Sequence, residues 1–172
     1  MTRRGLLLTM TEPTPAMEEE FNAWYDDEHM AERLAIPGFR SARRWVADVA
    51  PGEGKYLATY ELDSPGVLTS PEYLARFQNQ TPWSKRCLAK AIVFRRWACQ
   101  QTTPGDADPH AAAKFLLCVI AESPIALTVT GALQVRHFVA APSHIALAEL
   151  SHATLPPVKA GWSMHLYRAY AA

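Results

Sequence analysis

The feature that most constrains this 172-residue chain is a series of short apolar segments that recurs, in the same order, in its two halves. Short apolar runs bounded by Pro, Gly or acidic residues are typical of buried strands. Four pairs of segments match: 5–13 with 115–124, 41–47 with 134–140, 56–62 with 144–150, and 94–99 with 167–172. Chance similarity between strands is the alternative, but the spacing of the pairs favours a repeat.

That spacing falls steadily along the chain. It is 110 residues between Glu12 and Glu122, 88 between Glu61 and Glu149, and 73 between Arg95 and Arg168. Each decrease corresponds to the length of a helix with its loops. We therefore expect the second half to keep the strands of the first and to lose most of its helices.

The first half has the signals of a complete α+β unit. Strands are expected at 6–11, 39–49, 56–62 and 90–100, and helical segments at 15–34, 63–78 and 82–87. Thr14 followed by Pro15 marks the start of the first helix, and Pro37 with Gly38 marks its end. The order β-α-β-β-α-β is that of a ferredoxin-like domain.

The composition excludes several classes of protein. At 49% hydrophobic and 20% charged residues, it is that of a packed globular protein. The 17 basic and 17 acidic residues leave no net charge, which disfavours nucleic acid or a membrane as partner, and no apolar run is long enough to span a bilayer. Cys87, Cys99 and Cys118 lack metal-binding spacing, which suits buried thiols in a reducing compartment, so we expect a cytoplasmic protein.

A dense motif lies within the first predicted helix. The pattern F-x-x-W-Y-D-x-E-H spans 21–29, and it is followed by Pro37-Gly38-Phe39, Arg43-Arg44, Y-L-x-x-Y-E-L-D-S-P at 56–65, Ser70-Pro71 and Thr81-Pro82-Trp83. With these residues, the segment 5–100 resembles the dimeric α/β-barrel superfamily, in particular its EthD-like and related small-protein branches. The resemblance implies a barrel of two ferredoxin-like units paired sheet to sheet. It implies no single activity, because members include cyclases, isomerases, monooxygenases and dehydratases.

Together with the internal repeat, the resemblance implies an α+β fold in which tandem ferredoxin-like repeats form a pseudo-dimeric α/β barrel. We expect a complete repeat at 1–101, a linker rich in Pro and Asp at 102–113, and a degenerate, strand-rich repeat at 114–172 with shortened or missing helices. The protein would then be a monomeric pseudo-dimer or a homodimer.

His29 is the first candidate for catalysis. The resemblance places it near the mouth of a cleft between helix and sheet, where a histidine can move a proton near neutral pH. The neighbouring acids Asp26, Asp27 and Glu28 can orient its ring or raise its pKa. The alternative is a structural role, in which His29 stabilises the end of a helix.

Aromatic residues supply candidate walls for a small apolar ligand: Trp24, Tyr25, Tyr60, Trp83 and Phe94. We expect Tyr60 and Trp83 to line the pocket, and the other three to belong to the core.

Arginines are the candidate ligands for an anion. Strand periodicity places Arg43 and Arg44 on opposite faces, and separates Arg95 from its neighbour in the same way, so at least one arginine faces a buried or interfacial side. Such an arginine needs an anionic ligand or an acidic partner. Glu61 or Glu149 as a structural ion-pair partner is the favoured interpretation.

The second half is rich in histidine, with His137 and His165 on predicted strands where they could face the barrel interior and bind a ligand. No HxH or HxxxH spacing with supporting carboxylates occurs, so no metal is predicted. Haem is compatible with the resemblance, but no proximal histidine can be assigned. We therefore expect no cofactor.

The leading hypothesis is a cofactor-independent enzyme that isomerises, cyclises, dehydrates or cleaves a small hydrophobic molecule, aromatic or lactone-like, by general acid/base chemistry. His29 would be the acid/base, and Tyr60 would shape the pocket. One arginine, from among Arg44, Arg43 and Arg95, would hold an anionic oxygen. A non-catalytic ligand-binding or stress-response protein and a haem-dependent monooxygenase remain open alternatives.

Overall fold

The computed structural model describes residues 2–171, whose strands close into one barrel in the order β1-β3-β2-β8-β5-β7-β6-β4. The strands are β1 (Gly5–Pro13), β2 (Phe39–Val46), β3 (Tyr56–Leu62), β4 (Ala91–Thr103), β5 (Phe115–Ala121), β6 (Gln134–Ala140), β7 (Ser143–Leu150) and β8 (Ser163–Ala169). Neighbouring strands are antiparallel throughout. The fold is therefore an α+β antiparallel barrel, and the expected fold class is confirmed at this level.

The two halves of the barrel have corresponding strand orders. The first half runs β4-β1-β3-β2 around the barrel, and the second continues as β8-β5-β7-β6. The last strand was predicted too late in the sequence, because only its end, around Arg168, matches the first half; residue 172 of that prediction lies outside the described residues. β4 continues to Thr103, two residues into the segment expected as a linker, and pairs there with β6.

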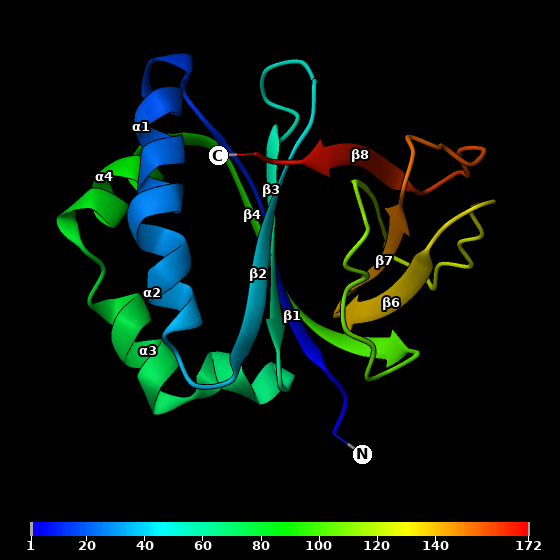
Figure 1. Ribbon diagram of the computed structural model, residues 1–172, viewed down its shortest axis with the longest axis horizontal. Helices are drawn as coiled ribbons and strands as arrows, with labels where there is room; N and C mark the ends of the chain where they lie inside the picture. The colour runs from blue at the N-terminus through cyan, green and yellow to red at the C-terminus, as the bar shows by residue number, and fades with distance from the viewer. Residues whose placement is uncertain (1, 172) are drawn as a thin grey trace.

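All helices of the described residues belong to the first half. They are the 3-10 helices η1 (Pro15–Met17) and η3 (Pro65–Thr69), the π-helix η2 (Tyr25–His29), and α1 (Glu18–Trp24), α2 (Met30–Leu34), α3 (Pro71–Gln78) and α4 (Pro82–Ala89). Figure 1 shows α1, α2, α3 and α4 on one side of the barrel, over the outer face of the first-half strands. None of them is long and apolar enough to cross a membrane.

Loops take the place of helices on the second half. Ile125, Leu127 and Val129 are buried on the outer face of β5 and β7, against Leu117 and Ala148. These loops do for the second half what helices do for the first, since the apolar outer face of a sheet must be covered.

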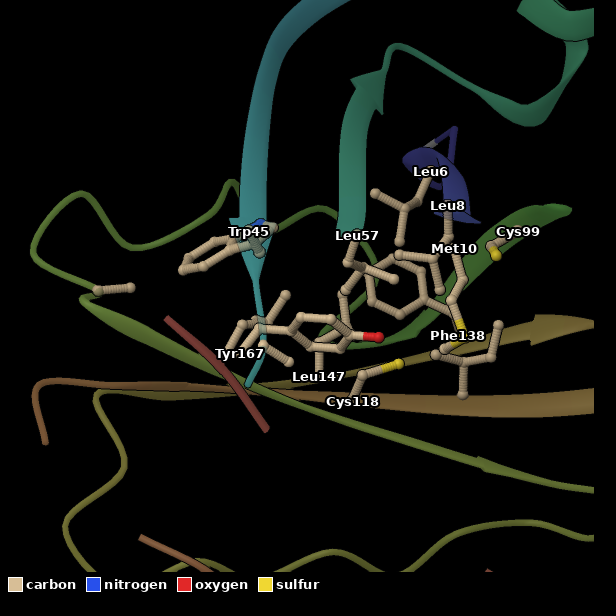
Figure 2. Packing of buried hydrophobic residues seen from close by; sticks show 14 of the residues in the cluster. Leu6, Leu8, Met10, Trp45, Leu57, Cys99, Cys118, Phe138, Leu147 and Tyr167 are labelled. Carbon is tan, nitrogen blue, oxygen red and sulfur yellow. The ribbon is translucent and has the colours of Figure 1, made fainter. Parts of the chain in front are cut away.

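The interior of the barrel is packed with side chains from both halves. Leu8 and Met10 of β1 meet Phe138 of β6 and Tyr167 of β8 there (Figure 2). The gap left beside Arg43 measures only about 20 Å³. The barrel interior is thus a core rather than a ligand chamber.

A buried ion-pair network crosses this interior. The guanidinium group of Arg136, on β6, donates twice to Glu61 on β3 at 2.9 Å, and to Glu149 on β7 at 2.7 and 3.0 Å. Glu61 and Glu149 are therefore structural ion-pair partners, as expected, but of Arg136 rather than of the three candidate arginines. Arg136 is the residue that the expected repeat would align with Arg43.

Candidate functional site

The helix that carries the 21–29 motif is interrupted by one wide turn. The π-helix η2 separates α1 from α2. In a regular α-helix, each step of four residues rotates a side chain by about 40°, so Phe21, Tyr25 and His29 would drift away from one face. The wider π turn offsets this drift, and all three side chains are buried. Single π turns are frequent at functional sites.

The buried side of this helix and the outer face of the sheet enclose a cavity of about 50 Å³. Six aromatic side chains form nearly half of its lining: Trp24, Tyr25, Tyr60, Tyr73, Phe77 and Phe94. Phe77 and Phe94 are 49% and 52% exposed, so they form the outer rim of the cavity, and the expectation that Phe94 belongs to the core was wrong. The remaining wall includes His29 and Arg33 from the helix, and Thr9 and Arg96 from the sheet.

Several polar atoms that line the cavity lack a partner. Thr9 Oγ1, Arg33 Nη1 and the Tyr60 hydroxyl are buried without a hydrogen bond among the described residues. Buried polar groups in native proteins are nearly always hydrogen-bonded. Three such groups around one cavity indicate a binding site for a polar group.

His29 is buried among aromatic rings. Its ring centroid lies 4.2 Å from that of Trp24, 5.0 Å from that of Tyr25 and 6.3 Å from that of Tyr60. Burial, together with the positive charges of Arg33 and Arg44, lowers the pKa of His29 to about 3. The imidazole is therefore neutral near physiological pH.

The acids next to His29 in sequence do not act on it as expected. Asp26 pairs with Arg44 at 3.0 Å, Asp27 is exposed, and Glu28 accepts a hydrogen bond from Thr81. The prediction that these acids raise the pKa of His29 was wrong, because they point away from the cavity.

Tyr60 is fully buried on β3. Burial first, and the neighbouring Tyr25 second, raise the pKa of Tyr60 well above its ordinary value. Its hydroxyl group stays protonated and can donate a hydrogen bond into the cavity.

Arg44 is buried behind the aromatic wall and does not line the cavity. Its guanidinium group bonds to Asp26 and Asn22, and lies 4.3 Å from the ring centroid of Tyr25 and 3.9 Å from that of Tyr170. The expectation that Arg44 holds a ligand oxygen is therefore corrected: its carboxylate partner is already present, and it positions the helix.

The other two candidate arginines lie on the barrel side of the sheet. Arg43 is 4.3 Å from the ring centroid of Trp45 and donates to the carbonyl group of Ala113. Arg95 approaches Met10 Sδ at 3.9 Å. Strand alternation separates both from the cavity beside His29.

Three further candidates also lie elsewhere. Trp83 packs against the helix-side core without lining the cavity. His165 lies beside Tyr167, with 6.4 Å between ring centroids, on the barrel side of β8. His137 points outward, because its neighbours Arg136 and Phe138 occupy the barrel interior.

His137 instead lines an open depression of about 390 Å³ on the second half, together with His144. This depression is larger than the cavity beside His29, but it is more open, and its polar lining consists of two histidines and three threonines without a charged side chain. No three His, Cys, Asp or Glu side chains gather as metal ligands anywhere in residues 2–171. We therefore take the cavity beside His29 as the candidate site.

Arg33 and Arg96 are cavity residues that sequence reasoning missed. Arg33 continues the four-residue spacing of Phe21, Tyr25 and His29, and this spacing is the signal that could have found it. Arg96 donates to the Tyr73 hydroxyl at 2.9 Å. It could have been found as the neighbour of Arg95 on the opposite, helix-side face of the strand.

Comparisons with known proteins bear on the fold. No family model matches the chain, and no curated protein matches it. A solved structure described as that of an anthrone oxidase-like protein superposes with a TM-score of 0.65, over 99% of this chain and 92% of that one, at 10% sequence identity. At this identity the likeness concerns the fold alone, and it supports a related barrel fold for this chain.

Proposed function

We propose that the cavity beside His29 binds a small hydrophobic molecule, aromatic or lactone-like, and that the protein is a cofactor-independent enzyme acting on it by general acid/base chemistry. The observation that carries the proposal is the convergence of a neutral His29 with the unpaired Tyr60 and Thr9 hydroxyl groups inside an aromatic cavity. The name of the solved structure, anthrone oxidase-like, fits an aromatic ligand.

The chemistry follows from the charges of the site. A neutral imidazole accepts a proton from an acidic C–H or O–H group of the ligand, while the Tyr60 hydroxyl donates to the oxygen that becomes negative. With a pKa of about 3, His29 alone is a weak base. Proton transfer from a bound ligand, however, forms an ion pair rather than an isolated buried charge, which raises the pKa of His29 at that step.

The size of the cavity limits how the ligand is held. A cavity that holds benzene measures about 150 Å³, and the enclosed space here is about 50 Å³. The reacting end of the ligand fits inside, and the remainder lies between the exposed rings of Phe77 and Phe94. A haem is far too large for this space, so the geometry does not favour the haem-dependent alternative.

Anthrone, a ketone with an acidic CH₂ group between aromatic rings, is a suitable probe. In D₂O without oxygen, we expect the protein to accelerate deuterium uptake at this CH₂ group, as measured by NMR. His29→Gln should return the rate to background with little change in melting temperature. His165→Gln serves as the matched control and should leave the rate unchanged.

Two results would count against this assignment. Unchanged exchange in His29→Gln would remove His29 from the chemistry. Tight binding of anthrone without exchange or conversion would favour the non-catalytic binding protein, which the small cavity and weakly basic His29 also suit.

The architecture proposed with this function is a tandem pair of ferredoxin-like repeats of the EthD-like kind, complete at 1–101 and degenerate at 114–172. The corresponding strand orders β4-β1-β3-β2 and β8-β5-β7-β6 support it. So does the placement of Glu61 and Glu149, aligned by the repeat, on the same arginine. The second repeat would supply the partner sheet, leaving a single cavity on the helix side.

A further inference from the structure

We infer that the ligand is a planar aromatic molecule carrying an anionic oxygen, a carboxylate or an ionised enol or phenol, and that Arg33 and Arg96 bind this oxygen. The inference rests on the proposed function in placing the ligand in the same cavity. It does not require that His29 be catalytic.

Arg33 is a buried cation without a counter-charge. Arg33 is only 9% exposed, and its Nη1 atom has no hydrogen-bond partner among the described residues. Its guanidinium carbon lies 5.6 Å from the centroid of the Tyr73 ring. A guanidinium group stays protonated in proteins, and a buried charge is costly unless it is paired.

The other buried arginines show how this chain normally compensates such a charge. Among the described residues, Arg44 and Arg136 are as deeply buried as Arg33. Arg44 pairs with Asp26, and Arg136 pairs with two carboxylates. The uncompensated charge of Arg33 is therefore an exception, and it occurs where the side chain lines a cavity.

A second guanidinium group adds to the positive charge. Arg96 lines the same cavity from β4, bonds to the Tyr73 hydroxyl and lies 6.0 Å from the centroid of that ring. The described residues that line the cavity include no carboxylate. The remaining titratable groups facing it are the neutral His29 and the phenols of Tyr25, Tyr60 and Tyr73. Within the described residues, the cavity is therefore positive, and an anionic ligand would neutralise it.

The form of the site narrows the ligand class. The fork of a guanidinium group matches the two oxygens of a carboxylate, or an oxygen with an adjacent acceptor. The aromatic wall and the rim of Phe77 and Phe94 suit a flat ring system. Both features are satisfied by an aromatic acid or by an acidic hydroxyarene.

Three probes with one ring system separate these requirements: 2-naphthoate, 2-naphthol and naphthalene, titrated by calorimetry or by their fluorescence. We expect 2-naphthoate to bind about tenfold or more tightly than naphthalene, the difference expected of a charged hydrogen bond. Binding of 2-naphthol should strengthen as the pH rises toward its ionisation. Preference for 2-naphthoate over ionised 2-naphthol, or the reverse, identifies the form of the anion.

Arg33→Met should remove the preference for 2-naphthoate while leaving naphthalene affinity within about twofold, because only the charged bond is lost. The melting temperature of ligand-free Arg33→Met should be unchanged or raised, since an unpaired buried charge is removed. Arg44→Met is the matched control and should lower the melting temperature, because it removes the bonds to Asp26 and Asn22 and the packing against Tyr25 and Tyr170. If Arg33→Met fails to fold, Arg96→Met tests the same role at an exposed position, and it should reduce the preference for 2-naphthoate.

The inference is overturned if naphthalene binds as tightly as 2-naphthoate, if neither probe binds, or if Arg33→Met weakens both equally. These results are distinct from a failure of the proposed function. If 2-naphthoate binds preferentially but deuterium exchange does not depend on His29, only the catalytic proposal is wrong. If exchange depends on His29 but binding shows no preference for the anion, only the role of Arg33 and Arg96 is wrong.

Discussion

At the scale of single residues, the surroundings of His29 determine its charge more than its neighbours in sequence do. Asp26, Asp27 and Glu28 are adjacent in the chain, yet they point to solvent or to other partners. The groups that face the ring are aromatic or positively charged. Burial and nearby cations both disfavour the imidazolium form.

This charge state makes the protein sensitive to acid. Unfolded His29 binds a proton below about pH 6.5, whereas folded His29 does so only near pH 3. Between these values the unfolded state binds more protons, so the free energy of unfolding falls as the pH falls. From about pH 7 to about pH 4, His29 should account for a loss of about 3 kcal/mol.

Urea denaturation of wild type and His29→Phe at both pH values measures this loss. His137 and His165, whose pKa values burial also lowers, remain in both proteins, so their contributions cancel. An equal loss in the two proteins would show that His29 is not held neutral.

The cavity could be predicted from the sequence only in part. The motif at 21–29 and the run at 56–65 drew attention to His29 and Tyr60, which the structure brings to one cavity. Arg33 was missed although it continues the four-residue spacing of Phe21, Tyr25 and His29, because in a regular α-helix that spacing drifts away from one face. Arg44 was misplaced because periodicity gives the face of a strand but not the partner that a side chain finds there.

At the scale of elements, turn and cap residues were the most reliable signals. Gly38 has a positive φ of 91° where α2 turns into β2, as its place after the helix predicts. The two later helices begin at caps that form hydrogen bonds: Ser70 accepts from the Tyr73 amide, and Thr81 accepts from the Ser84 amide. Thr14 precedes Pro15 at the first helix but forms no such bond.

These caps give a matched pair of substitutions. Thr81→Ala removes the cap of α4 and the bond to Glu28, so it should lower the free energy of unfolding by about 1 to 2 kcal/mol. Thr14→Ala should change it by less than about 0.5 kcal/mol, since no cap bond is lost. Thermal denaturation of both variants measures the difference in unfolding free energy. Equal effects would contradict the assignment of Thr81 as the stabilising cap of α4.

At the scale of the whole molecule, buried charges connect the two halves. Arg136 of the second half contacts Glu61 of the first and Glu149 of the second, all nearly inaccessible to solvent. The correspondence of segments between the two halves could be read from the sequence, because similar residues recur with decreasing spacing. The network itself could not, because alignment shows which positions correspond but not which side chains meet across a barrel.

Replacing Arg136 should lower the free energy of unfolding far more than replacing Arg43. Arg136→Met leaves two facing carboxylates buried, and should cost about 3 to 5 kcal/mol of unfolding free energy. Arg43→Met, at the aligned position, breaks one bond to a backbone carbonyl, and should cost about 1 kcal/mol. Chemical denaturation measures both losses of unfolding free energy. Equal losses in the two variants would contradict the stabilising role of the ion-pair network.

The central claim is that the ligand site lies between the helices and the outer face of the first-half sheet. A crystal structure of the protein with 2-naphthoate tests this most directly. The account predicts density in the cavity beside His29 and Tyr60, with the carboxylate against Arg33. Density confined to the depression beside His137 or to the barrel interior, or an empty cavity at saturating 2-naphthoate, would contradict it.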